Sequence, residues 1–300
     1  MAGDGVDQSI VFDCSGIDSA MRYLSGGGRR SFDELVASPG GLFAYRHYRW
    51  SNMDDETTAE EFWRRALERI PEAVARGASR VRDYVLAQSR SRWLPGVLEY
   101  LPRGHVFDST VYLNLGYDNV AYGGDVALNL AHPPFQIDHR EAVYYLMHEL
   151  AHAGYLGYHG MPGLASPGTW GELAGNVMFL THLEGMGVLT PLRVRVEEGG
   201  LSDPDYVALG DPAETGRRVR TYFGELGRLE CEPDRAVEEG DLDVYDRLSG
   251  RPLRLWYVAG CHMARAIEAQ RGAEILRELV REGSRAFFEV YRGINDPAKE

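Results

Sequence analysis

The sequence predicts an α+β protein that is mainly helical. Apolar residues recur at helical intervals along most of the 300-residue chain. They alternate with polar residues in two short stretches, 106–115 and 125–131, which are separated by glycine-rich turn signals. These two stretches are expected to pair as a small antiparallel sheet, with helices forming the rest of the fold.

The chain is expected to have two regions. Residues 1–104 have mainly helical patterning, and Pro71 should kink or split the helix expected around 55–77. Glycine and proline at 95–104 mark a break, and the character of the sequence changes at His105. We therefore expect a helical N-terminal region, 1–104, and a second region, 105–300, that forms one unit.

The second region should contain one long helix followed by several others. Asp138-His-Arg-Glu141 has the form of a helix N-cap with glutamate at the third position, so a helix is expected from about Asp138 to Gly154 or Gly157. A further helix is expected over 169–188, with others at 214–229, 241–248, 253–271 and 273–292.

Composition excludes several classes of partner. The formal net charge is −13, and the arginines are interleaved with acidic residues, which argues against nucleic-acid binding. Cys14, Cys231 and Cys261 are too few and too far apart for a disulfide framework or a cysteine zinc site. No apolar stretch approaches ~20 residues, and the N-terminus lacks the pattern of a signal peptide. A cytoplasmic location with no membrane partner is the expectation.

The segment His148-Glu149-Leu150-Ala151-His152 carries the strongest chemical signal. Four residues are just over one helical turn, so both imidazoles should project from one face, within reach of one zinc ion. Glu149 can act as general base toward a water whose pKa zinc lowers to about 7. Catalytic zinc keeps one position open, so three protein ligands are expected. The structural alternative is a histidine pair without metal.

Two glutamates compete as the third ligand. Glu172 lies 20 residues after His152, but Thr169-Trp-Gly-Glu172 also has the form of a capping box. Glu184 lies further along the same expected helix. Twelve residues of helix span about 18 Å, so the two glutamates cannot bind the same ion. Asp138 and Asn176 are candidates to accept hydrogen bonds from the ligand histidines.

The HELAH segment, followed by Glu184-Gly185-Met186-Gly187 on the next helix, resembles the gluzincin metallopeptidases, including their aminopeptidase branch. In that family the glutamate of E-G-x-A is the third zinc ligand, so the resemblance favours Glu184. The spacing of Glu172 is close to that in thermolysin-like enzymes, which keeps it as the alternative. Zinc-protease families with longer and variable spacing between the two motifs resemble the chain more closely overall. The resemblance implies that 105–300 is a zincin-like catalytic region.

A second resemblance lies near the C-terminus. Tyr257-Val-Ala-Gly260 is similar to the Y-x-x-G segment of gluzincin aminopeptidases, whose tyrosine stabilises the transition state. The resemblance implies that Tyr257 donates a hydrogen bond to the developing oxyanion. His262 is the alternative donor, and a packing role for Tyr257 is the structural alternative. The G-x-M-E-N strand of the aminopeptidases has no counterpart at 123–130, so exopeptidase specificity is not implied.

These motifs together predict a zinc-dependent hydrolase, a metallopeptidase that cleaves a peptide or small amide substrate. His148, His152 and Glu184 would bind zinc, Glu149 would be the general base, and Tyr257 would stabilise the oxyanion. Two alternatives stay open. One is a non-proteolytic metal enzyme on the same scaffold that acts on a small metabolite, and the other is a non-catalytic binding module.

Overall fold

The computed structural model describes residues 8–53 and 56–294. Two compact units form, one from Met1–Leu94 with Val106–Ala153 (unit 1), the other from Pro95–His105 with Gly154–Glu300 (unit 2). The described residues are mainly helical with one small sheet, which confirms the α+β prediction. The division into 1–104 and 105–300 stays a prediction of domain organisation. Each compact unit contains residues from both ranges.

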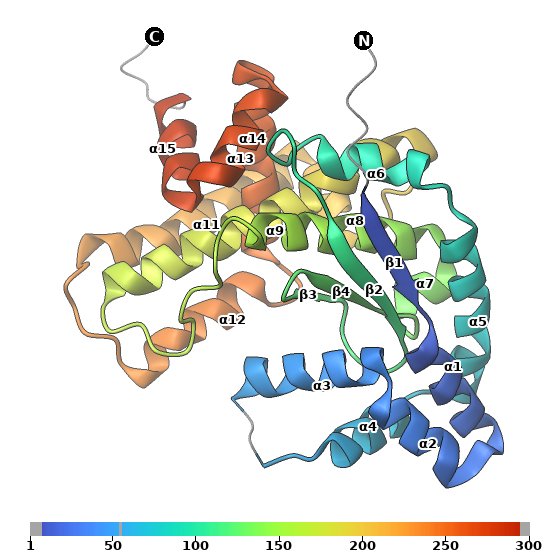
Figure 1. The fold of residues 1–300 in the computed structure, drawn as a ribbon. Coiled ribbons are helices and arrows are strands. Elements are labelled where there is room, and N and C mark those ends of the chain that lie inside the picture. The colour runs from blue at the N-terminus through green and yellow to red at the C-terminus, as the bar shows by residue number, and fades with distance from the viewer. Residues whose placement is uncertain (1–7, 54–55, 295–300) are drawn as a thin grey trace. The chain divides into compact units, whose positions relative to one another are not determined.

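Unit 1 contains the sheet. Its described strands are β1 (Ser9–Asp13), β2 (Asp108–Asn114), β3 (Val120–Tyr122) and β4 (Asp125–Asn129), in the order β1-β2-β4-β3 (Figure 1). Strand β2 is parallel to both β1 and β4, and β3 is antiparallel to β4.

The predicted antiparallel pairing of 106–115 with 125–131 is therefore wrong. After β2 the chain runs as β3 along the outer edge of the sheet. It then reverses at Gly123-Gly124, so that β4 returns between β2 and β3. The short strand β3 takes the antiparallel place beside β4, and β2 and β4 run in the same direction with Val111 opposite Val126.

Strand β1 lies inside the region that was expected to be mainly helical. It pairs in register with β2 from Ser9 opposite Asp108 to Asp13 opposite Tyr112. Ile10 is fully buried, whereas Val11 is 57% exposed. Five residues with one buried position give too short an alternation to stand out from the helical patterning that follows.

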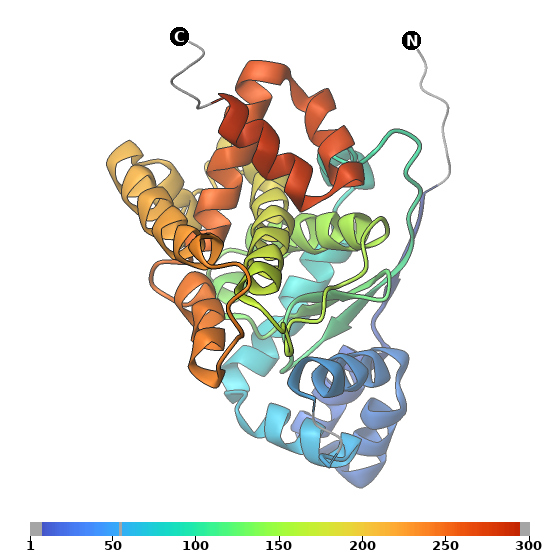
Figure 2. The same cartoon turned by 90° about the vertical axis from the view of Figure 1, so that its left-hand side faces the viewer.

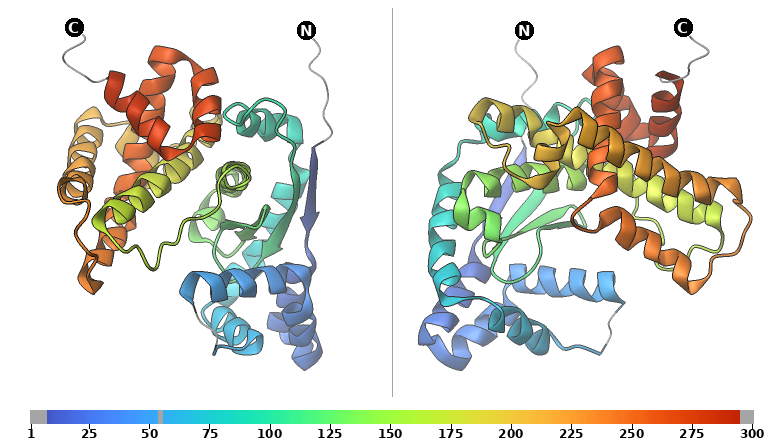
Figure 3. Two further views of the ribbon diagram at one scale, coloured as in Figure 1. Left: turned by 60° about the vertical axis from the view of Figure 1, so that its left-hand side comes forward. Right: turned by 180° about the vertical axis from the view of Figure 1, so that it is seen from behind.

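Helices surround the sheet in unit 1. Beyond the carboxyl end of β1 lie the helices drawn in blue (Figures 1 and 3), α1 (Ser15–Arg22), α2 (Gly28–Ala37), α3 (Pro39–Asn52) and α4 (Ala59–Glu68). Helix α3 packs on the sheet through Phe43, whose ring lies 4.9 Å from that of Tyr112. Helix α5 (Glu72–Ala87) has Pro71 as its N-cap, so the predicted split at Pro71 is confirmed. A short helix, α7 (Pro133–Ile137), precedes α8 (Arg140–Leu156).

Unit 2 is helical (Figure 2). Helix α13 (Leu255–Arg271) packs against several others: α9 (Trp170–Glu198), α10 (Pro204–Leu209), α11 (Pro212–Cys231), α12 (Asp243–Ser249), α14 (Ala273–Glu282) and α15 (Ser284–Ile294). A 3-10 turn, Glu239–Leu242, precedes α12, and α6 (Arg90–Leu98) links the units along the chain. Among the described residues, no helix combines the length and apolarity that crossing a bilayer requires.

Two helix boundaries in unit 2 differ from prediction. Helix α9 continues to Glu198, past the predicted end at 188, because residues on both sides of Pro191 are buried and their packing outweighs one lost backbone hydrogen bond. The single helix predicted over 273–292 is two helices. Gly283, with φ +95°, separates α14 from α15, because that conformation cannot continue an α-helix.

Candidate metal centre

Helix α8 places the HELAH segment. Its start is fixed by Asp138, whose Oδ1 accepts a hydrogen bond from the Arg140 amide at 3.0 Å, so the predicted start is confirmed. Hydrogen bonds from the Arg140 side chain also hold the pKa of Asp138 below its usual range. The apolar residues of the pattern are buried: Val143, Leu146, Met147 and Leu150. This burial fixes the rotation of α8 about its axis and hence the face that carries the histidines.

His148, Glu149 and His152 lie together, as predicted. Their potential ligand atoms are within 4.8 Å of one another. The two imidazole rings have centroids 4.4 Å apart, and Glu149 Oε2 lies 3.5 Å from His152 Nδ1. His148 is half-buried, whereas Glu149 and His152 are 5% and 7% exposed. The cluster can hold a metal ion.

The chemistry of this donor set fits zinc. His148 and His152 supply two imidazole nitrogens, which are donors that zinc accepts, and Glu149 lies beside them as the expected base, so a third ligand has to come from outside this cluster. A buried carboxylate is costly unless it has a partner. A cation bound by the two histidines would compensate the charge of Glu149.

Two residues that the sequence analysis missed lie within electrostatic reach of Glu149. Burial lowers the pKa of His47, on α3, and the negative charge of Glu149 opposes that shift. Burial and then the charge of Glu149 raise the pKa of Asp118, in the loop between β2 and β3. His47 Nδ1 lies 2.7 Å from the Tyr117 hydroxyl, which orients its ring. Their distance from the HELAH segment along the chain left no local signal for either residue.

Glu184 and Tyr257 belong to unit 2, where α9 and α13 bring them together. A Cβ on Gly185 would lie 2.4 Å from the backbone carbon of Gly260, and a Cβ on Gly260 would lie 2.2 Å from the Thr181 carbonyl oxygen. The two helices thus touch backbone to backbone at the glycines of the E-G-x-G and Y-x-x-G segments. This close approach explains why both segments carry glycine at these positions.

Glu184 and Tyr257 interact electrostatically where α9 and α13 cross. Burial raises the pKa of Tyr257, and the charge of Glu184 raises it further. Glu184 is half-buried. Glu184 and Tyr257 therefore lie near each other in unit 2, whereas the described cluster of potential metal ligands on α8 contains His148, Glu149 and His152 and does not include Glu184.

Arg254 lies beside Glu184 and Tyr257, and the sequence analysis did not identify it. Its guanidinium carbon lies 3.5 Å from the centre of the Tyr257 ring, and its Nε lies 2.8 Å from both carboxylate oxygens of buried Asp205. Burial alone would lower the pKa of Arg254, but Asp205, Tyr257 and Glu184 together raise it. Arg254 is therefore a fixed cation that packs on Tyr257 and acts on Glu184 electrostatically.

Glu172 has a capping role. Thr169 accepts a hydrogen bond from the Glu172 amide at 3.3 Å, and the Glu172 carboxylate accepts one from the Gly168 amide at 2.6 Å. The side chain is exposed at the start of α9. Its carboxylate thus binds backbone at the helix start, but at Gly168 and not at the N-cap Thr169, so the predicted capping box is only half formed.

The other candidates lie elsewhere in unit 2. His262 is five residues after Tyr257 on α13, about 140° around the helix, and its ring contacts Tyr291 of α15. Asn176 donates hydrogen bonds to the Gly163 carbonyl and the Tyr245 hydroxyl. His182 is fully buried and stacks on Phe287 at 4.1 Å. These residues pack or bridge loops within unit 2.

Comparison with protein-family models, with curated proteins and with solved structures finds no match to this chain.

Proposed function

We propose that the protein is a zinc-dependent hydrolase that cleaves amide bonds, with a peptide as the favoured substrate. The observation that carries the proposal is the cluster on α8, where two imidazoles and the Glu149 carboxylate lie within 4.8 Å. The packing of a helix does not require three buried or half-buried polar side chains on one face. A metal site with an adjacent general base requires this arrangement.

Each residue of the cluster has a chemical role in this proposal. His148 and His152 hold the ion through neutral imidazole nitrogens. Zinc, when bound, supplies Lewis acidity, which lowers the pKa of a coordinated water and polarises the substrate carbonyl. Glu149 accepts the proton of the attacking water and delivers it to the leaving amine. The Tyr257 hydroxyl donates a hydrogen bond to the oxyanion.

Glu184 is proposed as the third ligand over Glu172. The sequence resemblance favours it, and the capping contacts of Glu172 give that carboxylate another function. Glu184 also has neighbours that suit a ligand carboxylate. The Arg254 cation acts on it, and Tyr257, the proposed oxyanion donor, lies within its electrostatic reach.

Zinc content tests the ligand set. The protein, purified without chelator or added metal, is expected to carry about one zinc per chain by elemental mass spectrometry. Glu184→Ala should lose most of this zinc, because two imidazoles alone bind zinc weakly, and the matched control Glu172→Ala should retain it. Loss in Glu172→Ala alone would transfer the ligand role to Glu172. Absence of zinc from the wild type, also after reconstitution, would overturn the proposal.

The oxyanion role of Tyr257 has a separate test. Tyr257→Phe removes one hydrogen-bond donor and keeps the ring over Arg254, so kcat on a cleaved peptide should fall about a hundredfold with zinc content unchanged. His262→Gln is the matched comparison on the same helix, and its kcat should stay near the wild-type value. A larger loss in His262→Gln than in Tyr257→Phe would assign the donor role to His262.

A further inference from the structure

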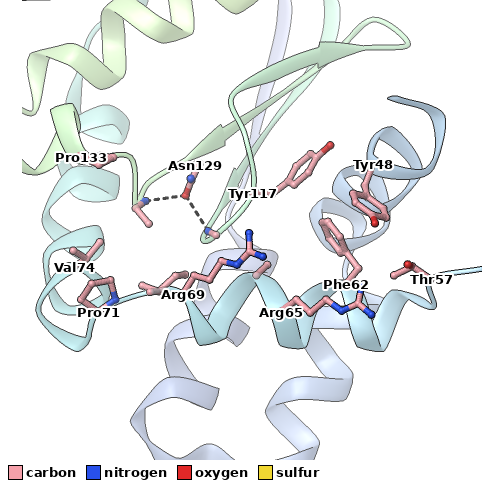
Figure 4. A pocket seen from close by; sticks show the side chains of 14 residues that line it. Tyr48, Thr57, Phe62, Arg65, Arg69, Pro71, Val74, Tyr117, Asn129 and Pro133 are labelled. Carbon is pink, nitrogen blue, oxygen red and sulfur yellow. Dashed lines mark hydrogen bonds between the residues drawn. The ribbon is translucent and has the colours of Figure 1, made fainter. Parts of the chain in front are cut away.

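A cavity of about 510 Å³ lies within unit 1 (Figure 4). Helices α3, α4 and α5, the loops after β2 and β4, and the start of α7 form its walls. This volume lies within the range of roughly 300–1,000 Å³ that small-molecule sites occupy. None of the proposed hydrolytic residues lines it.

The position of the cavity is typical of a ligand site. Strands β2 and β4 are parallel, and the residues that follow their carboxyl ends, Gly116 and Ala131, line the cavity. In open α/β sheets, ligands bind at the carboxyl ends of parallel strands. Asn129 ties the two loops together, because its Oδ1 accepts hydrogen bonds from the Gly116 amide at 2.9 Å and from the Ala131 amide at 3.0 Å. The shape of the cavity is therefore set by the backbone.

The inner wall is largely apolar. Phe62 of α4, Ile70 and Pro71 of the α4–α5 connection, Val74 of α5 and Pro133 of α7 supply carbon surface. A wall of this kind favours a ligand with an apolar body, since burial of such a body is favourable by its area.

Two arginines supply the polar part of the cavity. Arg65 and Arg69 lie one helical turn apart at the end of α4, and both line the cavity with exposed side chains (Figure 4). Across the described residues, no carboxylate lies within ion-pair distance of either guanidinium. Two like charges at this spacing repel each other. An anion between them would relieve that repulsion.

Two of the three acidic residues of α4 have other partners, and the third, Glu68, is exposed and forms no ion pair with either arginine among the described residues. Glu60 forms an ion pair with Arg29 at 2.7 Å. The Glu61 carboxylate accepts a hydrogen bond from the Thr58 amide at 3.1 Å in a capping box. The chain has a net charge of −13, so solubility does not require two arginines at this place. Both arginines line an apolar cavity and have no carboxylate partner there among the described residues.

We propose that this cavity binds a small organic carboxylate with an apolar body. The planar guanidinium matches a carboxylate through paired hydrogen bonds, and the apolar wall takes the rest of the molecule. A guanidinium also pairs with phosphate, so the preference for an organic carboxylate comes from the apolar wall, which inorganic phosphate would leave uncovered. A fatty acid and the C-terminus of a peptide share this chemistry, so both are probed. The proposal does not depend on hydrolytic activity.

Isothermal titration calorimetry with four probes tests the proposal. Octanoate and N-acetyl-Leu-Phe carry the carboxylate, and octanamide and N-acetyl-Leu-Phe amide are their neutral counterparts. At least one carboxylate should bind saturably at one site per chain, with its amide about tenfold weaker or more, because the amide cannot pair with the guanidinium. The tighter of the two carboxylates identifies the source.

Variants locate the site. The double substitution Arg65→Gln and Arg69→Gln should weaken binding of the carboxylate about tenfold or more. Arg64→Gln is the matched control, because Arg64 is exposed on the same helix and does not line the cavity, and binding should be unchanged. All three substituted residues are exposed, so the variants should fold, and their unfolding midpoints verify this. Val74→Trp, which fills the cavity, should abolish binding independently.

The proposal is overturned by any of three results. These are the absence of saturable binding by both carboxylates, equal affinity for a carboxylate and its amide, and wild-type affinity in the double arginine variant.

Discussion

Replacement of Glu149 by glutamine is expected to lower kcat about a thousandfold on a peptide that the wild-type protein cleaves, while zinc content stays unchanged. The carboxamide is nearly isosteric with the carboxylate but cannot accept the proton of the attacking water. His148 and His152 remain in place, and the ion loses only a neighbouring charge 3.5 Å from His152 Nδ1. Steady-state assays with the peptide in excess, together with elemental analysis of the same sample, measure both quantities.

A matched control separates this effect from a general loss of charge. Glu68→Gln makes the same chemical change at an exposed position of α4 and should leave kcat and zinc content at their wild-type values. Hydrolysis in Glu149→Gln at more than about a tenth of the wild-type rate, well above what loss of a general base allows, would reject Glu149 as the base. Complete loss of zinc in the same variant would instead make Glu149 a ligand.

Gly185→Ala is expected to lower the free energy of unfolding by about 3 kcal/mol. The new Cβ would lie 2.4 Å from the carbonyl carbon of Gly260, which is backbone on α13 and cannot rotate away. Relief requires α9 and α13 to move apart, which opens a contact between two largely buried helices. Equilibrium denaturation with a chelator present measures the effect, because bound zinc would otherwise add its own contribution.

Gly175→Ala on the same helix is the control. A Cβ at Gly175 meets no atom within 4 Å, so this change should stabilise the protein by about 0.5–1 kcal/mol through helix propensity. Equal effects of the two substitutions would mean that the close approach of α9 and α13 contributes little. If Gly185→Ala lowers the free energy of unfolding and Gly175→Ala raises it, Gly185 is required for the close packing of α9 against α13.

The sequence predicts the HELAH site because its information is local. The spacing of His148, Glu149 and His152 within one helix, the cap at Asp138 and the buried apolar stripe are all contained in one short segment. One helix of known periodicity fixes which side chains share a face. The same reasoning correctly predicted Thr169 as the N-cap of α9, although the Glu172 carboxylate accepts from Gly168 and not from Thr169.

Features that depend on distant segments were not predictable in this way. His47 and Asp118 reach Glu149 from other elements, and no spacing rule connects them with α8. The parallel pairing of β2 and β4 depends on β3, a strand of three residues that is too short for a periodic signal. Arg254 contacts Asp205 only after α10 has packed against the start of α13.

The pairing of β1 with β2 affects how this protein can fold. Ser9 lies opposite Asp108, so the two strands are joined by a loop of about a hundred residues, and such a contact must close a large loop before it gains any stabilisation. During synthesis β1 therefore cannot pair with β2 until most of unit 1 has been made. Strand β2 has a free edge for pairing as soon as it leaves the ribosome. Because β4 follows β2 after a short connection, we expect β2, β3 and β4 to associate first. Strand β1 would then complete the sheet last, although it is made first.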